Sequence, residues 1–493
     1  MKEAMLNFDE RTGPNQGVNA PHWPSTRVPQ WWKDAKLGFF THWGLYSVPA
    51  WATTNPDPVP LEQEYAHHCY AEWYANTVRI LDSPTRQHHD RVYGIGTSDE
   101  DCADWWTPDL DAPATLIRRI ADAGAGYVIP TTKHHDGFCL WDTDTTGFNA
   151  AKRGPHRDLV KALHDEARAA GLRFGVYYSG ALDWHVGDFG AITSDTELFT
   201  FRRNDPDFAK YCAAQLTELI ARFRPDILWN DIEWPDAGKG RQPYGLASLF
   251  SYYLKQVPEG VVNDRWGVSH HGFLTREYRH VDAKINEPWE STRGLGCSFG
   301  YNQEESTDES LSGTELVRYL VDVVAKNGNL LINVGPRADG SIPEVQAAAM
   351  AELGRWMRVH GEAIRGTRPW GHGVYDDQRI VKRGETVYVH LLDGDALHLP
   401  DELKVFDVSW IGSQSKQTSV PCELVPPPAT GATRTQGGGS LVVRRPPTAR
   451  GPLRDRTSSC EGMDRQSYLG EAIPGRSPRP ERIPFVHTQQ LQF

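Results

Sequence analysis

The residues best suited to chemistry are two carboxylates with an arginine between them in the chain. Asp231 ends the apolar run DILWND, close to Trp229 and Trp234, and Glu277 lies twelve residues after Arg265. A carboxylate at the end of a buried strand is costly unless it is paired with another group or has a catalytic or binding role. Hydrolysis of a glycosidic bond requires one ionised and one protonated carboxyl group, and this pair could supply them. A helix cap, or a structural ion pair between Asp231 and Arg265, is the alternative at this stage.

Histidine is concentrated in the segment KHHDG at 133–137, and His42 follows another apolar run. Neighbouring residues of a strand point to opposite faces unless a bulge intervenes, so joint ligation of a metal by His134 and His135 is not expected. Zinc needs three protein ligands, and no HExxH motif or carboxylate at matching spacing supplies the others. We predict no metal and no cofactor. These side chains then either hydrogen-bond a polar ligand or are ordinary core histidines.

Three further residues have weaker support from type and spacing alone. Tyr177 lies in the strand-like run LRFGVYYS, where it could face either the core of a sheet or a covering helix. Glu72 and Trp73, in YAEWYANTV, are typical of the start of an ordinary amphipathic helix.

The elements that carry these residues alternate along the chain. Short apolar runs and segments of helical period follow one another, which is typical of βαβ units and a parallel sheet. Strands are expected at 36–44, 126–137, 172–179, 226–231, 260–266 and 329–335, and helices at 157–171, 207–223, 312–328 and 342–364. No GxGxxG or GxxxxGK[ST] motif supports a nucleotide-binding open sheet. The candidate residues stand where strands end, so we predict a (β/α) TIM-like barrel with its site at those ends.

A change of pattern divides the chain into three parts. Residues 1–365 are expected to form the catalytic barrel, and 366–445 a small β-sandwich-like domain, because alternating runs appear at 379–393 and 402–412. Whether that domain is complete is left open. Residues 446–493 are rich in Arg and Pro and are predicted to be disordered.

Composition excludes several classes of protein. The 493 residues carry a net charge of −12, which argues against a nucleic-acid partner. No apolar run approaches the roughly 20 residues of a membrane span, and the N-terminus lacks the apolar core of a signal peptide, so a cytoplasmic protein without membrane contact is expected. Seven scattered cysteines without a CxxC pair predict free thiols.

Several segments are long enough to be specific motifs: AKLGFFTHWGLYSVPAW, EWYANT, TTKHHDGFCLWDT, KRGPHRDLV, GLRFGVYYSGALDW, PDILWNDIEWP, VVNDRWG, SFGYN and LVDVVAKNGNLLINVGPRADGSIPE. Together, from about residue 30 to 370, they resemble the α-L-fucosidases of glycoside hydrolase family 29. The resemblance implies a catalytic (β/α) barrel followed by a β-sandwich, retaining chemistry, and no metal.

The resemblance also implies a role for each candidate residue. Asp231 of the WND motif matches the family's nucleophile, and Glu277, in a TREY context, matches the acid/base of the bacterial members. Glu287 and Glu290 are rivals because the loop after NDRWG varies in length. Matches to fucose-contacting positions are His42, Glu72, Trp73, His134, His135, Tyr177, Trp229, Arg265 and Phe299. Polar members would bind sugar hydroxyls, and aromatic members would cover the C5 methyl group.

The function that this resemblance implies is a retaining exo-α-L-fucosidase of the broad-specificity bacterial type. It would remove terminal α-L-fucose from fucosylated oligosaccharides, glycoconjugates or aryl fucosides through a covalent fucosyl-enzyme. The alternatives are a fucose-binding protein without catalysis and an enzyme that acts mainly as a transfucosidase. The presence of both carboxylates favours an enzyme. Linkage preference and assembly as a homo-oligomer are not decided by the sequence.

Overall fold

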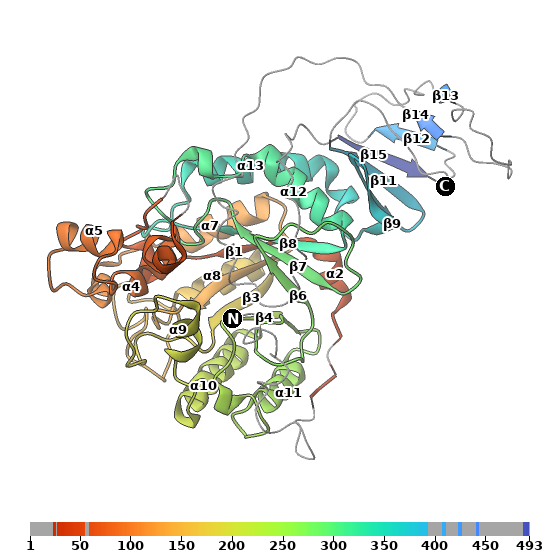
Figure 1. The fold of residues 1–493 in the computed structure, drawn as a ribbon. Coiled ribbons are helices and arrows are strands. Elements are labelled where there is room, and N and C mark those ends of the chain that lie inside the picture. Colours follow the sequence, from red (N-terminus) through yellow and green to blue (C-terminus); the bar gives the residue numbers. More distant parts are fainter. Residues whose placement is uncertain are drawn as a thin grey trace.

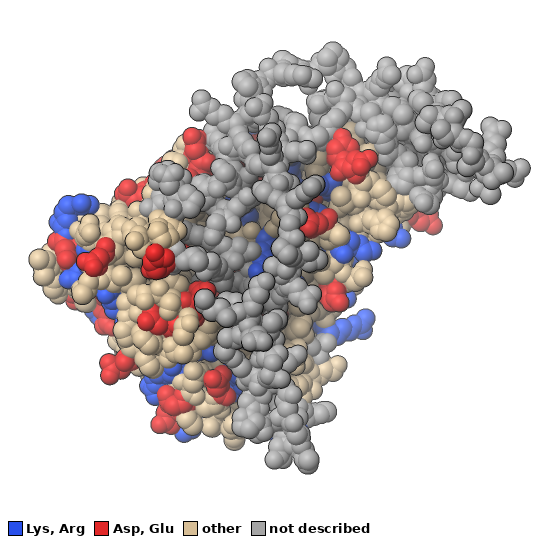
Figure 2. All heavy atoms as spheres, in the orientation of Figure 1, with Lys and Arg blue, Asp and Glu red and all other residues tan. Residues whose placement is uncertain are grey.

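A computed structural model describes residues 23–25, 27–54 and 59–392, together with four strand segments at 407–410, 423–425, 440–442 and 487–492. Within these residues, no helix is both long and apolar enough to cross a membrane. On the described part of the face in Figure 2, basic and acidic side chains are interspersed, without a continuous basic area.

Eight parallel strands form the central sheet (Figure 1). They are β1 (Leu37–Thr41), β2 (Tyr127–Lys133), β3 (Arg173–Ser179), β4 (Ile227–Asp231), β5 (Val261–Val262), β6 (Leu274–Glu277), β7 (Trp289–Gly294) and β8 (Gly328–Val334). The order across the sheet is β5-β4-β3-β2-β1-β8-β7-β6. Its two ends meet where the backbone N–H groups of Gly272 and Phe273 donate to the carbonyl of Val262, at 3.0 and 3.3 Å. These bonds close the sheet, and the predicted barrel is confirmed.

Two strands of the barrel have no counterpart in the sequence-based expectation. β6 and β7 read LTRE and WESTRG, so they lack the continuous apolar run that marks strands covered by helices on their outer face. The connections before and after β6, residues 263–273 and 278–288, contain no helix. β6 has no helix in the connections on either side of it, whereas β7 contacts α12 through polar side chains, since Ser291 hydrogen-bonds Tyr319 at 2.7 Å.

Helices cover the outside of the other strands. α7 (Ala112–Asp122), α8 (Leu159–Ala169), α10 (Pro206–Phe223), α11 (Leu246–Gln256) and α12 (Gly313–Ala325) connect strands, and α13 (Glu344–His360) follows β8. Side chains of Asp158, Asp205 and Ser312 accept backbone hydrogen bonds at the starts of α8, α10 and α12. Shorter helices are α2 (Gln30–Ala35), α3 (Glu64–His67), α4 (Tyr74–Thr77), α5 (Pro84–Val92), α6 (Cys102–Trp105) and α9 (Asp195–Thr200).

The barrel interior is filled by one side chain from every second position of each strand. Phe40, Tyr177 and Trp229 belong to this inner cluster. Trp229 meets the edge of Phe40 at 4.9 Å between ring centroids and stacks on Tyr177 at 5.6 Å. Because the period is two, His42 and Asp231 point to the same inner side, one layer nearer the carboxyl ends of the strands.

A second, antiparallel sheet follows the barrel and lies beside α12 (Figure 1). Its order is β12-β15-β11-β10-β9, with a separate pair β13-β14. The strands are β9 (Arg368–Tyr375), β10 (Gln378–Arg383), β11 (Thr386–Leu391), β12 (Asp407–Trp410), β13 (Glu423–Val425), β14 (Ser440–Val442) and β15 (His487–Gln492). An ion pair of 2.6 Å joins Arg379 of β10 to Asp322 of α12.

Strand β15 corrects part of the expectation for residues 446–493. It pairs with both β11 and β12, so these six tail residues are ordered in the sheet rather than disordered. β10 pairs with only one side of β11, so the other edge of β11 has free backbone groups. A distant segment such as β15 can pair with that edge. The rest of the tail lies outside the described residues. Cys297 is disulfide-bonded, which also corrects the expectation of free thiols at that position, whereas Cys69, Cys102, Cys139 and Cys212 are free.

Candidate active site

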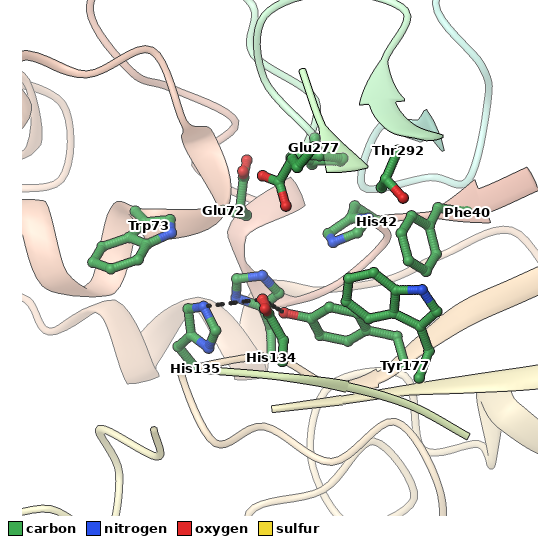
Figure 3. A pocket seen from close by; sticks show the side chains of 12 residues that line it. Phe40, His42, Glu72, Trp73, His134, His135, Tyr177, Glu277 and Thr292 are labelled. Atoms are coloured by element: carbon green, nitrogen blue, oxygen red, sulfur yellow. Dashed lines mark hydrogen bonds and ion pairs between the residues drawn. The ribbon is translucent and has the colours of Figure 1, made fainter. Parts of the chain in front are cut away.

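A pocket lies at the carboxyl ends of the barrel strands (Figure 3). Ten of the eleven residues singled out from the sequence line it, and the eleventh, Arg265, contacts three of them. Phe40 and Thr292 also line the pocket and were missed. Phe40 lies two residues before His42, so it faces the same side of the sheet, and this spacing could have identified it as a pocket residue. The residues that line the pocket are Phe40, His42, Glu72, Trp73, His134, His135, Tyr177, Trp229, Asp231, Glu277, Thr292 and Phe299.

Asp231, the last residue of β4, is held ionised by its neighbours. Its Oδ1 accepts a hydrogen bond from Arg265 at 3.0 Å, and its Oδ2 accepts one from the Tyr177 hydroxyl at 2.9 Å. Burial alone would raise the pKa of Asp231. The charge of Arg265, together with these hydrogen bonds, outweighs burial and lowers the pKa below its ordinary value. The carboxylate is therefore negatively charged and directed into the pocket.

Arg265 joins the two carboxylates. Its second terminal nitrogen lies 2.5 Å from Oε2 of Glu277, the last residue of β6. The guanidinium lies 4.8 Å from the centre of the Trp229 ring, and its Nε donates to Thr275 at 3.0 Å. The aromatic face and three oxygen partners fix the orientation of this cation. Asp231 and Glu277 are consequently held on two nitrogens of one planar group.

The turn after Asp231 is strained and firmly anchored. Ile232 and Glu233 have φ values of 52° and 62°, in the left-handed region that β-branched residues avoid. The buried amide of Asn230 donates to the carbonyls of Glu233 and Arg265, both at 2.8 Å. Asn230 thus ties the strand that carries Asp231 to the residue that binds both carboxylates. Sequence reasoning had assigned it no part.

The two rival glutamates occupy different surroundings from Glu277. Glu287 is exposed on the loop between β6 and β7 and does not line the pocket. Glu290 is buried inside the barrel, where it accepts hydrogen bonds from Tyr127 at 2.5 Å and from the indole of Trp229 at 3.1 Å. Of the three carboxylates, Glu277 alone lines the pocket that contains Asp231.

The histidines reach the pocket because β2 ends just before them. The pairing of β2 with β3 shifts register between Thr131 and Lys133, and His134 and His135 follow the last strand residue. Their side chains can therefore point the same way, which regular alternation would forbid. Gly137 makes the following turn at φ 80°, where an added Cβ would lie 2.3 Å from Asp183.

These histidines are neutral. Burial lowers the pKa of His42 and of His135 to about 4 and that of His134 well below its ordinary value. A ring nitrogen of His42 hydrogen-bonds Asn333 at 2.7 Å, and a ring nitrogen of His135 hydrogen-bonds Ser179 at 2.7 Å. Nδ1 of His134 is buried without a partner among the described residues. A neutral imidazole with a free nitrogen suits a sugar hydroxyl, which can both donate and accept.

Glu72 and Trp73 do not begin an amphipathic helix. They lie in the buried 3₁₀ turn Ala71–Trp73, and Glu72 accepts hydrogen bonds from the Gly300 N–H at 2.8 Å and from Ser298 at 3.0 Å. Burial raises the pKa of Glu72 to about 7 despite these bonds. The turn is thereby fastened to the loop that carries Phe299.

We expect a pH dependence of stability from Glu290. Burial raises its pKa to about 8, from an ordinary 4.5. Because the folded pKa is the higher one, this group stabilises the fold fully below pH 4.5, and the contribution is lost as the pH rises through 8. Thermal unfolding should therefore show a stability that declines from pH 6 to 8.5. The variant Glu290→Gln, which cannot ionise, should remove roughly 2–3 kcal/mol of that decline. A decline equally steep in both proteins would contradict the assignment.

Chemistry at this site is expected to proceed without a metal. Among the described residues, no three His, Cys, Asp or Glu side chains gather as a ligand set. Prolonged dialysis against EDTA should leave the turnover rate unchanged. Loss of activity that zinc or another divalent ion restores would overturn the hydroxyl-binding role given to His134 and His135.

A barrel with two carboxylates facing one pocket at the ends of its strands is the construction of a glycoside hydrolase. The sequence model of the family described as Alpha-L-fucosidase matches residues 9–362. On this match the chain belongs to the α-L-fucosidase family, and the resemblance seen in its motifs is confirmed.

Individual relatives agree with the family match. Human plasma α-L-fucosidase is 31% identical over 371 residues, which are 71% of this chain and 72% of the relative. The Thermotoga maritima α-fucosidase in complex with fucose is 37% identical with a TM-score of 0.75, over 94% of this chain and 97% of the other. The same enzyme in complex with a mechanism-based inhibitor is 38% identical with a TM-score of 0.76, over 95% and 97%.

Proposed function

We propose that this α-L-fucosidase hydrolyses terminal α-L-fucosides with retention, through a covalent fucosyl intermediate on Asp231. The observation that carries the proposal is the contact of one guanidinium, that of Arg265, with both pocket carboxylates. Retention uses a nucleophile and an acid/base separated by a short distance, and a shared planar partner keeps two carboxylates close.

The first step breaks the bond to the leaving group. A carboxylate oxygen of Asp231 attacks C1 of fucose, the C1–O bond breaks, and Glu277 gives its proton to the departing oxygen. In the second step Glu277 takes a proton from water as that water attacks C1. The C1–O bond to Asp231 breaks as the water attacks, and α-L-fucose leaves with its original configuration.

Glu277 must change partners between these steps. Its ion pair with Arg265 stabilises the ionised carboxylate, which is the form that the second step needs. Donation of a proton in the first step requires the neutral form. The proposal therefore includes displacement of Glu277 from Arg265 when substrate enters, on a segment that no helix covers.

The rest of the pocket fits a deoxy sugar. Neutral His42, His134 and His135 offer nitrogens to hydroxyl groups, while Phe299 and Trp229 offer apolar surface to a methyl group. The related Thermotoga maritima enzyme was crystallised with fucose, which supports a terminal α-L-fucosyl group as the ligand here.

A binding protein without catalysis would need the histidines and aromatic residues but not the two carboxylates. Transfucosylation uses the same residues and differs in whether water or a sugar hydroxyl resolves the intermediate. Release of nitrophenol from an aryl α-L-fucoside, compared with the matching galactoside and xyloside, tests the activity. A folded preparation that releases nothing from the fucoside would refute it. The cytoplasmic location expected from the sequence stays a prediction.

A further inference from the structure

A second pocket lies on the long connection between β3 and α10. It has a volume of about 430 Å³. Cavities of roughly 300–1,000 Å³ are typical of small-molecule sites. The lining comes from two segments, 186–189 and 202–205, which flank α9.

This second pocket neighbours the catalytic one. Trp184, two residues before the first segment, contacts Trp73 and His135 at 5.3 and 5.4 Å between ring centroids. From the second segment, Arg202 donates to Glu233 at 3.2 Å, two residues beyond Asp231. Arg79 links Trp184 to the second pocket, since its guanidinium lies over the Trp184 ring at 5.9 Å and donates to the carbonyl of Phe189 at 3.4 Å. The second pocket is therefore close to the catalytic pocket, although the two have no lining residue in common.

The lining combines a flat apolar surface with unsatisfied polar groups. Phe189 is 39% exposed and stacks on Phe201 at 6.0 Å. Asn204 accepts a hydrogen bond through its carbonyl oxygen from the N–H of Asp236, at 3.2 Å, and its amino group has no protein partner in the described chain. Arg202 is only 8% exposed, and its Nε and Nη1 have no hydrogen-bond partner among the described residues. Such unpaired buried donors are costly unless a ligand or water meets them.

The charge of the lining selects among ligands. Arg202 is paired with Glu233, and Arg203 is paired with Asp205 through bonds of 2.8 and 2.9 Å. Asp188 has no ion pair or hydrogen bond within the described residues and adds an unpaired negative charge at the exposed rim. An anionic ligand is disfavoured. A neutral sugar fits, because its ring can lie on Phe189 while its hydroxyl groups meet the carboxylate and the amide.

We infer that this second pocket is a subsite for a neutral sugar residue of the fucosylated glycan, beyond the fucose that the catalytic pocket holds. The inference rests on the proposed function and specifies its substrate as an oligosaccharide that occupies both pockets.

The test compares two kinds of substrate in one variant. Values of kcat/KM are measured for an aryl α-L-fucoside and for lactose- or chitobiose-based oligosaccharides with α1,2-, α1,3-, α1,4- and α1,6-linked fucose. For at least one oligosaccharide, Phe189→Ala should lower kcat/KM about tenfold more than for the aryl fucoside, which corresponds to about 1.4 kcal/mol. Phe189→Tyr keeps the ring and should stay within about threefold of the wild type. Val359→Ala, which shortens an exposed side chain on α13, should change neither substrate.

Each outcome decides the inference. Equal losses on all substrates, or no loss on any oligosaccharide, would overturn the subsite. If Phe189→Ala fails to fold, Asp188→Asn provides the same comparison, because Asp188 has no structural partner. No release from either kind of substrate by the folded wild type would instead refute the proposed function itself.

Discussion

Replacement of Asp231 by alanine should abolish turnover while leaving the barrel folded. The proposed intermediate is an ester of this carboxylate, and no other carboxylate can take its place, so kcat should fall by at least about 10⁴-fold. Arg265 keeps Glu277 as a partner in the variant, which avoids an unpaired buried cation. Hydrolysis of an aryl fucoside, together with thermal unfolding of the same preparation, provides the measurement.

Azide separates loss of the nucleophile from general damage. The cavity left by Asp231→Ala should admit azide, restore part of the activity, and yield β-L-fucosyl azide, since one displacement inverts the configuration. The isosteric variant Asp231→Asn serves as a control that should be equally inactive but have less room for azide. Near-normal rates in either variant would remove Asp231 from the mechanism.

Replacement of Glu277 by alanine should have an effect that depends on the leaving group. A poor leaving group, such as a sugar hydroxyl, needs a proton in order to depart, and general acid catalysis contributes roughly 10²- to 10⁴-fold. An activated nitrophenolate needs no proton. Glu277→Ala should therefore lose far more activity on a fucosylated oligosaccharide than on the nitrophenyl fucoside, as measured by kcat/KM for the two substrates.

The rival glutamates supply matched comparisons. Glu287→Gln changes an exposed carboxylate and should leave both substrates unaffected. Glu290→Gln replaces a buried carboxyl group that supports Trp229, and its effect should be similar for both substrates. The assignment of the acid/base would move to either residue if that variant, and not Glu277→Ala, discriminated between leaving groups.

The barrel could be predicted from the sequence where strands are buried on both faces. Runs such as DILWND and NLLINVG are apolar because helices cover them. β6 and β7 could not be found in this way, because their sequences LTRE and WESTRG are polar. Strand β15 was missed for another reason: its pairing with β11 joins segments about a hundred residues apart, which local periodicity does not report.

The site was largely predictable because its residues lie in recognisable motifs at strand ends. Alternation alone gave no reason to place His134 and His135 together, because the register shift in β2 is a tertiary feature. Spacing could not rank Glu277, Glu287 and Glu290 either. Their difference is one of burial and direction, which depends on where β6 and β7 lie in the barrel. Asn230 was overlooked because its contacts run through its side-chain amide to distant backbone carbonyls.

The anomer that forms first tests the central claim most directly. Proton NMR during the first minutes of aryl α-L-fucoside hydrolysis distinguishes α- from β-L-fucose before mutarotation mixes them. The double displacement at Asp231 predicts that α-L-fucose appears first and that the β anomer grows in later. If β-L-fucose appears first, hydrolysis proceeds by a single inverting displacement, and the role of Asp231 as a nucleophile is wrong.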